Sequence, residues 1–130
     1  MQADQKTLVR DYIRAVGEGR LDEVAQYLRE DVTFDGPGLT SSRGADAYLA
    51  ALRRLEPIIA RNEVKSILVD GDEACVLYDF VTDTPVGAVA SAEWLRLEGD
   101  RIASVYLLFD KANWPTVLQA LKDRASVPSA

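Results

Sequence analysis

The segment VGAVASAEWLRLEGDRIASVYLLF, residues 86–109, decides the fold. Its apolar side chains recur at every second position on both sides of Glu98-Gly99-Asp100, a sequence typical of a tight turn. This pattern predicts two paired strands, Val86–Leu97 and Arg101–Phe109. The same period occurs just upstream and predicts two further strands, over Glu63–Val69 and Ala74–Thr82.

Before residue 63 the hydrophobic spacing becomes helical. Apolar residues three and four positions apart predict helices over Gln5–Val16, Leu21–Leu28 and about Ala45–Ala60. Ser42, with Gly44 and Asp46 as alternatives, is expected to begin the third helix, and Pro57 to bend or end it early. The other expected elements are a short strand over Val32–Phe34, a loop over Gly36–Ser42 and a closing helix over Trp114–Lys122.

Helices followed by hairpin-linked strands predict an α+β fold. We expect a curved antiparallel sheet wrapped around the N-terminal helices. The wide end of the resulting cone would form a ligand pocket. The 130 residues are 48% hydrophobic, which is enough for one domain, placed at residues 1–125 with a mobile tail at 126–130.

The composition also excludes several function classes. A net charge of -6 argues against nucleic acid and anionic membranes as partners. The sequence has no histidine, which excludes histidine bases and histidine-bound metals, and we expect no metal or other cofactor. The single cysteine, Cys75, allows no intrachain disulfide. With no apolar N-terminal segment and no long apolar run, these features predict a cytoplasmic protein.

Four segments of the chain carry a resemblance to a known family. They are the opening of two helices at Tyr12–Val24, the strand entry Leu28–Phe34, Gly44 before the third helix, and the hairpin Trp94–Ile102 with Leu108-Phe109-Asp110. In this order they resemble the nuclear-transport-factor-2-like superfamily, which includes SnoaL-type polyketide cyclases, ketosteroid isomerases and limonene epoxide hydrolases. The likeness extends over about residues 5–114. It implies a cystatin-like roll with an apolar pocket, a fold that hosts enzymes, binding proteins and assembly domains.

Tyr12 and Glu93 are the first candidate catalytic residues. Tyr12 lies on the apolar face of the first expected helix, where the resemblance to ketosteroid isomerases implies a hydrogen-bond donor to the substrate oxygen. Glu93 lies on the strand face that we take as concave, where burial would raise its pKa. The same resemblance implies a protonated acid at this position, beside the tyrosine. The alternatives are a tyrosine of the core and a solvated glutamate at the rim.

Asp35 and Asp79 are candidate bases. The resemblance implies an isomerase base at Gly36, but the carboxylate stands one residue earlier, and one step along a strand changes the face. Asp35 therefore either reaches the pocket through a bulge or caps a turn, and we favour the turn. Asp79 would pair with Glu93 if it faced the cone and would meet water or a partner if it faced outward, and the resemblance to isomerases favours outward. Epoxide hydrolysis is disfavoured because the last strand lacks a matching acid.

Apolar side chains are expected to line the pocket, with Trp114 as a lid. The expected ligand-binding residues are Leu28, Phe34, Tyr48, Leu52, Leu107, Phe109 and Trp114. On the convex face, alternation exposes Trp94 and Tyr106, which predicts a homodimer through the sheet.

Two hypotheses of function follow. The leading one is a small-molecule-binding SnoaL-like protein, which as an enzyme would be a cofactor-free isomerase or cyclase. Such an enzyme would act on an apolar ketone-bearing substrate by general acid–base chemistry. The alternative is a non-catalytic domain for ligand binding or dimerisation.

Overall fold

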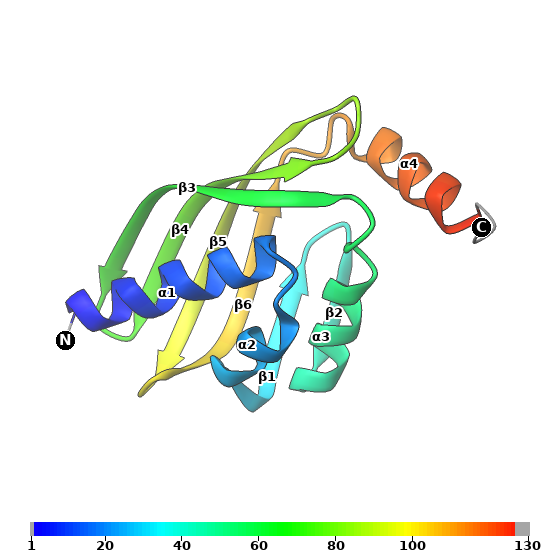
Figure 1. Ribbon diagram of the computed structural model, residues 1–130. Helices are drawn as coiled ribbons and strands as arrows, with labels where there is room; N and C mark the ends of the chain where they lie inside the picture. The colour runs from blue at the N-terminus through cyan, green and yellow to red at the C-terminus, as the bar shows by residue number, and fades with distance from the viewer. Residues whose placement is uncertain (1, 127–130) are drawn as a thin grey trace.

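A computed structural model describes residues 2–126 of the chain (Figure 1). The helices are α1 (Gln2–Gly17), α2 (Leu21–Gln26), α3 (Ala45–Arg53) and α4 (Trp114–Ser126). The strands are β1 (Leu28–Gly36), β2 (Thr40–Arg43), β3 (Ile59–Asp70), β4 (Glu73–Thr82), β5 (Ala88–Glu98) and β6 (Arg101–Phe109). The tail expected to be mobile lies outside the described residues, apart from Ser126, which ends α4.

The strands form one curved sheet in the order β2-β1-β6-β5-β4-β3, which confirms the predicted α+β fold. The hairpin-linked neighbours from β3 to β6 are antiparallel, and so are β1 and β2. However, β1 runs parallel to β6, with Phe34 beside Val105. The sheet is therefore mixed, and the prediction of a wholly antiparallel sheet is wrong at this one pair. Parallel neighbours are joined through a long connection, so no local turn signal marks them.

The third helix begins at Ala45 and ends well before residue 60, the early end that was expected from Pro57. α3 ends at Arg53, and a series of turns leads to β3 at Ile59. Pro57 has no backbone N–H and restricts the residue before it, so the helix cannot continue to residue 60. Gly44, not Ser42, is the N-cap of α3, and its φ of 91° lies in a region that favours glycine.

Two segments differ in class from the prediction. Residues 40–43 form β2 rather than a loop, because the chain reverses at Pro37–Leu39 and pairs with the end of β1. The Leu39 N–H donates to the Gly36 carbonyl across this turn at 2.8 Å. Leu28 does not end α2 but begins β1, where it lies beside Ile102 of β6.

The helix α1 lies across the concave face of the sheet, and α2 and α3 cover the side near β1 (Figure 1). Val9 and Ile13, in the apolar stripe of α1, are fully buried. Near its end α1 approaches β3 so closely that a methyl group at Gly17 would stand 2.3 Å from the backbone nitrogen of Asn62. The Asn62 side chain donates to the Ile13 carbonyl at 3.0 Å and ties the two elements together.

The closing helix α4 lies at the end of the sheet, away from the other helices (Figure 1). It confirms the helix predicted over 114–122 and continues to Ser126. Val117 is fully buried, and Arg124 donates to the Pro57 carbonyl at 2.6 Å and pairs with Asp83 at 3.4 Å. None of the helices between residues 2 and 126 is long and apolar enough to cross a membrane.

Candidate functional site

The candidate site lies on the concave face, at Glu93 of β5. Glu93 stands opposite Val76 of β4 and Leu107 of β6, so strands flank it on both sides. Alternation along β5 turns Glu93 inward and Trp94 outward, as predicted from the sequence. Glu93 is 4% exposed and Trp94 is 55% exposed. Tyr12 reaches Glu93 from the buried face of α1.

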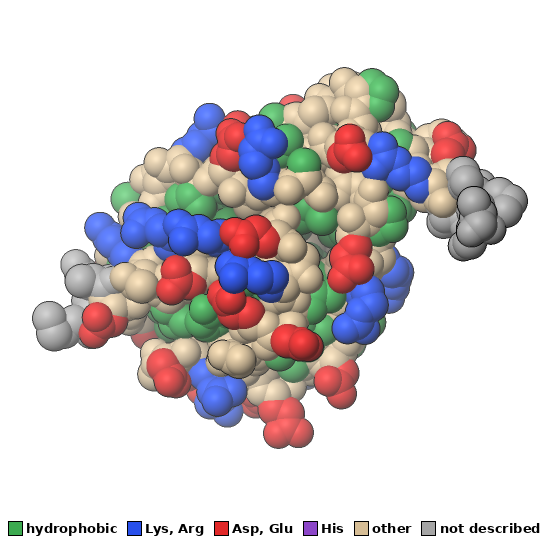
Figure 2. Space-filling view, viewed as in Figure 1, with side chains coloured by type: hydrophobic (Ala, Val, Ile, Leu, Met, Phe, Trp, Pro, Cys, Tyr) green, Lys and Arg blue, Asp and Glu red, His purple; other side chains and the backbone are tan. Residues whose placement is uncertain are grey.

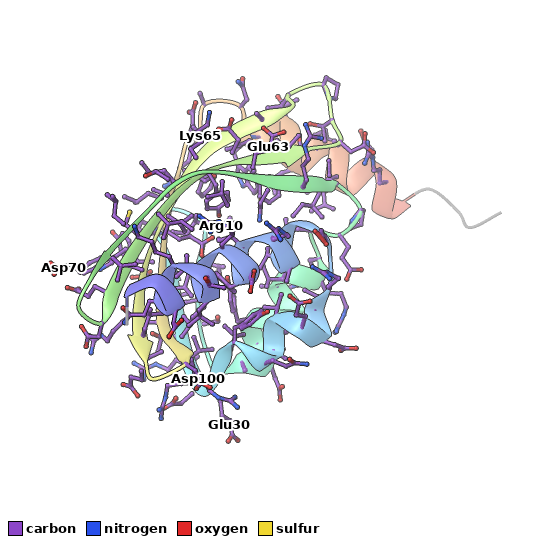
Figure 3. All side chains as sticks on the ribbon, turned by 60° about the vertical axis from the view of Figure 1, so that its left-hand side comes forward. Arg10, Glu30, Glu63, Lys65, Asp70 and Asp100 are labelled. Atoms are coloured by element: carbon purple, nitrogen blue, oxygen red, sulfur yellow. The ribbon has the colours of Figure 1, made fainter. Side chains whose placement is uncertain are left out.

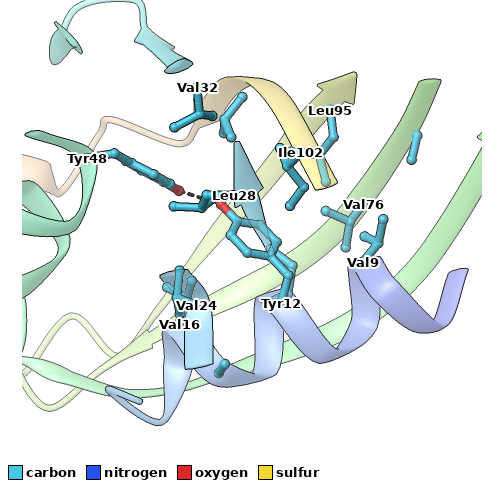
Figure 4. Close-up of a cluster of buried hydrophobic side chains, with 14 of the residues drawn as sticks. Val9, Tyr12, Val16, Val24, Leu28, Val32, Tyr48, Val76, Leu95 and Ile102 are labelled. Atoms are coloured by element: carbon cyan, nitrogen blue, oxygen red, sulfur yellow. Dashed lines mark hydrogen bonds between the residues drawn. The ribbon is translucent and has the colours of Figure 1, made fainter. Parts of the chain in front are cut away.

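Four side chains, Tyr12, Tyr48, Tyr78 and Glu93, form a hydrogen-bonded group that we call the tyrosine–glutamate cluster. Tyr12 donates to Oε1 of Glu93 at 3.1 Å, and Tyr78 donates to Oε2 at 2.5 Å. The Tyr48 hydroxyl from α3 meets the Tyr12 hydroxyl (Figure 4). All four side chains are buried. A carboxyl group is therefore enclosed by phenols inside an otherwise apolar core.

Burial determines the protonation of the cluster. Loss of solvent raises the pKa of Glu93, although the hydrogen bonds from Tyr78 and Tyr12 oppose this shift. Burial also raises the pKa of Tyr12, Tyr48 and Tyr78 well above the usual value for a phenol, and the nearby Glu93 adds to the shift. The three tyrosines are therefore neutral at physiological pH, and Glu93 holds its proton to a higher pH than an exposed glutamate.

The number of protons decides what the cluster can bind. With Glu93 ionised, three hydroxyl protons meet three acceptors: Tyr48 donates to Tyr12, and Tyr12 and Tyr78 donate to the carboxylate. Protonation of Glu93 adds a fourth proton, so one O–H group needs an acceptor outside these contacts. If Glu93 donates to Tyr12 and Tyr12 to Tyr48, the freed donor is the Tyr48 hydroxyl. A protonated cluster can thus donate a hydrogen bond to a ligand oxygen.

The two candidate bases do not join the cluster. Asp35 is exposed and accepts a hydrogen bond from Ser41 at 3.0 Å across the β1–β2 hairpin, so it acts in the turn, as favoured from the sequence. Asp79 stands on β4 one residue after the inward Tyr78 and pairs with Lys65 at 3.3 Å, with its side chain 20% exposed. The only carboxyl group within the cluster is that of Glu93.

The expected lining residues form two groups. The first is part of the core around the cluster: Leu28 and Phe34 are buried, Phe34 stacks on Tyr48 with ring centroids 5.0 Å apart, and Leu52 and Leu107 pack against the same core. The buried side chains of Tyr12 and Tyr48 lie beside Leu28 in this core (Figure 4). The ligand pocket expected here stays a prediction.

The second group is aromatic and lies at the end of β6, beyond Leu107. Phe109 stands opposite Ser91, and Trp114 packs edge-on against Phe109 with ring centroids 4.9 Å apart. The ring centroid of Phe80 lies 6.4 Å from that of the same indole. We call Phe80, Phe109 and Trp114 the aromatic cap. The indole Nε1 of Trp114 is buried and has no hydrogen-bond acceptor within the described chain.

The sequence analysis missed the role of two tyrosines. Tyr78 lies on a strand whose two faces are both largely apolar, so alternation alone could not select its direction. Tyr48 was expected only as part of the apolar wall. The available signal was the spacing: Tyr78 stands opposite Ser91, two residues from Glu93 on the same face, which is within reach of a long side chain.

Two hollows on the surface are lined by other residues. One of about 340 Å³ lies between α1 and β3 and includes Arg10, Arg14 and Asn62. The other, of about 530 Å³, is bordered by Arg29, Glu30, Asp31 and Arg101. Across residues 2–126 no group of three or more acidic or cysteine side chains could hold a metal ion.

Several solved structures have the same fold. A candidate ketosteroid isomerase from Kribbella flavida DSM 17836 is 21% identical, with a TM-score of 0.75 over 85% of this chain and 80% of that one. A candidate SnoaL-like polyketide cyclase from Shewanella denitrificans OS-217 is 17% identical, with a TM-score of 0.76 over 92% and 99%. A de novo designed protein with a curved β-sheet is 19% identical, with a TM-score of 0.77 over 95% and 98%. Since a designed chain also adopts the fold, the fold alone defines no activity.

The sequence itself matches a family. No curated protein matches it significantly. A family model described as the SnoaL-like domain, however, matches residues 9–105, which contain Tyr12, Tyr48, Tyr78 and Glu93. The match covers most of the chain and agrees with the resemblance seen in its motifs. The chain belongs to the SnoaL-like domain family of the nuclear-transport-factor-2-like superfamily.

Proposed function

We propose that this protein binds an apolar small molecule through a carbonyl or hydroxyl oxygen that accepts a hydrogen bond from the tyrosine–glutamate cluster. The observation that supports the proposal is the proton count of the cluster: if a protonated Glu93 donates to Tyr12, the Tyr48 hydroxyl is left without an acceptor inside the cluster. An unsatisfied donor in an apolar core is costly, and a ligand oxygen would satisfy it. The surrounding side chains, Leu28, Phe34 and Leu107 among them, favour an apolar ligand body.

The aromatic cap is the proposed entrance. Phe109 lies on the same strand face as Leu107, which stands opposite Glu93, so the cap adjoins the cluster along β6. Its unpaired Trp114 Nε1 offers a second donor to a polar atom of the ligand. Trp114 belongs to α4, which is not part of the sheet and is held by side-chain contacts and by Arg124, so the ligand would enter by displacement of the indole.

Binding without proton abstraction is the form of the function that the geometry supports best. An isomerase or cyclase needs a base beside the substrate, and neither Asp35 nor Asp79 reaches the cluster. One observation favours the catalytic alternative: burial raises the pKa of Glu93 above that of an exposed glutamate, which suits a group that gives and takes a proton. In that case Tyr12 would donate to the ketone oxygen, and an ionised Glu93 would have to take the proton from the α-carbon and return it to the product carbon.

Titration with progesterone, an apolar enone, tests the binding proposal by quenching of tryptophan fluorescence. Tyr48→Phe removes the proposed donor and should weaken binding about tenfold. Tyr106→Phe, on the convex face, is the matched control and should bind like the parent. Glu93→Gln keeps a neutral donor at the site, so it should still bind, and its affinity should not fall as pH rises, unlike that of the parent.

If progesterone is not bound, native mass spectrometry of the purified protein extends the test to a co-purified apolar molecule. If the protein neither binds progesterone nor carries a co-purified apolar molecule, the binding proposal is wrong. Deuterium uptake at the α-carbon of progesterone in heavy water separates the two forms of the function. We expect uptake no faster than in buffer, whereas uptake that is lost in Glu93→Gln would favour the isomerase or cyclase.

We also propose that two copies pair through the convex face of the sheet. Leu68, Cys75, Trp94 and Tyr106 stand in register across β3, β4, β5 and β6, and Leu77, Ala92 and Leu108 form the next row. Trp94, Leu108, Leu77 and Leu68 are each more than 40% exposed. A continuous apolar row over four strands is a self-complementary surface for a twofold dimer.

A further inference from the structure

Two arginines face a hollow at the edge of the sheet. Arg10 and Arg14 stand four residues apart on the solvent side of α1, and both line the hollow of about 340 Å³ beside β3. In Figure 2 a row of Lys and Arg side chains marks the line where α1 runs beside β3. Cations that lie one helical turn apart repel each other, and an anion between them would relieve this repulsion. The overall charge of the chain is -6, so this positive surface is local.

Two carboxylates near these arginines are engaged with other cations. Glu18, one turn beyond Arg14, pairs with Arg20 at 2.9 Å, and Glu63 of β3 pairs with Arg61 at 2.7 Å. Neither Arg10 nor Arg14 has an ion pair within residues 2–126. Both guanidinium groups are therefore available to an external anion.

The wall opposite the arginines is part of β3, the edge strand. Its outward backbone N–H groups have no neighbouring strand, and the register shifts between Val64 and Ser66, where the strand is irregular. Lys65 also borders the hollow, but its ammonium group pairs with Asp79 at 3.3 Å. Figure 3 shows Arg10 in the space between α1 and β3 and Lys65 on the other side of β3. The charge of the hollow thus comes from the two arginines.

The two walls of the hollow are fixed relative to each other. Asn62, which lines the hollow, donates to the Ile13 carbonyl at 3.0 Å, and Gly17 lies directly against the Asn62 backbone. Val64 and the buried Ile67 supply apolar surface beside the arginines. A preformed hollow with a charged side and an apolar side suits an organic anion, and its volume falls in the range of small-molecule sites, roughly 300–1,000 Å³.

We propose that the hollow between α1 and β3 is a binding site for a small phosphate monoester, with the phosphate on Arg10 and Arg14 and the organic part on Val64 and Ile67. Guanidinium groups bind phosphate oxygens in a bidentate manner, and a phosphate monoester carries close to two negative charges at neutral pH, matching two arginines. The site is separate from the tyrosine–glutamate cluster, because Tyr12 is on the buried face of α1.

Phenyl phosphate is the probe, titrated at constant ionic strength and followed by amide chemical shifts. We expect saturable one-to-one binding, with shifts concentrated at residues 62–67 and 10–14. The double variant Arg10→Gln/Arg14→Gln should bind at least about tenfold more weakly. Arg53→Gln/Arg54→Gln removes the same charge from two exposed arginines at the end of α3, away from the hollow, and should leave the affinity within about twofold of the parent.

Two matched probes test the two halves of the ligand. Inorganic phosphate should bind at the same residues but more weakly, since it lacks the apolar part. Benzoate has the ring and a single negative charge, and should bind more weakly than phenyl phosphate. Equal loss in both double variants would reduce the effect to general charge and overturn the site. Absence of saturable shifts at residues 62–67, or tighter binding of benzoate, would overturn the proposed ligand. Circular dichroism checks that each variant is folded.

Discussion

The two faces of the curved sheet depart in opposite ways from the rule that charged side chains are exposed and large apolar side chains are buried. On the concave face Glu93 is 4% exposed, and on the convex face its neighbour Trp94 is 55% exposed. Inside, a carboxyl group is enclosed by phenols that satisfy it, whereas outside an indole and several leucines lie in water. Each exception costs stability in the isolated chain. Together they are the basis of the two proposals made above, recognition of a small polar group at the concave face and association at the convex face.

Among the variants that test the difference between the two faces, loss of the Glu93 carboxyl should change the free energy of unfolding most. Glu93→Ala leaves the Tyr12 and Tyr78 hydroxyls without their acceptor and opens a cavity, so the free energy of unfolding should fall by about 3 kcal/mol. Urea unfolding at a fixed protein concentration measures this. Glu93→Gln is the control, since it keeps the volume and one acceptor, and should lose less than half as much. Equal losses would mean that the volume kept by Gln contributes nothing and that both carboxyl oxygens are needed as acceptors.

On the convex face, the corresponding test is Trp94→Ser. If the exposed rows form the dimer interface, loss of the indole should weaken dimerisation by about 2 kcal/mol, or roughly 30-fold in Kd. Analytical ultracentrifugation measures the change. Leu39→Ser, at an exposed leucine in the β1–β2 turn, is the matched control and should leave the dimer intact. A parent protein that is monomeric at high concentration would remove the association role from this face.

The bounds of a strand and the face on which its side chains lie could be predicted from the sequence wherever the local pattern of alternation determines them. The strand Arg101–Phe109 begins and ends where its alternation predicts, and alternation along β5 gave the directions of Glu93 and Trp94. The parallel pairing of β1 with β6 was not predictable in this way, because the two strands are far apart in sequence and no turn joins them.

The cluster itself was predictable only in part. Tyr12 and Glu93 were expected to meet, and they do, at 3.1 Å. Tyr78 was missed because Val76 and Phe80 on its own face and Leu77 and Val81 on the other are all apolar, so the sequence gives no preferred direction. The contact of Tyr48 with Tyr12 depends on how α3 packs against α2 and β1, which no spacing within either helix determines.

A smaller effect is expected from hydroxyl groups removed singly from each face. Tyr78→Phe deletes one donor to the buried Glu93, and should lower the free energy of unfolding by about 1.5 kcal/mol. Tyr106→Phe on the convex face deletes a partly exposed hydroxyl, and should change stability by less than about 0.5 kcal/mol. Thermal and urea unfolding of both variants measures the contrast. Similar losses in the two variants would contradict a special role for hydrogen bonding inside.

The pH dependence of stability gives the finest test, because it isolates the protonation of Glu93. Burial raises the folded pKa of this carboxyl above its usual 4.5. At a pH between the unfolded and the folded pKa of Glu93, the unfolded chain has released the proton while the folded chain keeps it. The stability that this proton contributes at low pH is therefore lost as pH rises through the folded pKa. The slope should be at most about 1.4 kcal/mol per pH unit.

Glu93→Gln provides the reference for this measurement. Exposed ion pairs such as Arg29 with Asp31, which lowers the pKa of Asp31, have the opposite dependence but occur in both proteins and cancel in the difference. The free energy of unfolding of the parent minus that of Glu93→Gln should therefore decrease from about pH 4 towards neutral pH. A difference that stays flat would show that the pKa of Glu93 is the same in the folded and unfolded protein, so that Glu93 is ionised in the folded protein at neutral pH. The three phenol protons would then all be used within the cluster, and no donor would be free for a ligand on the concave face.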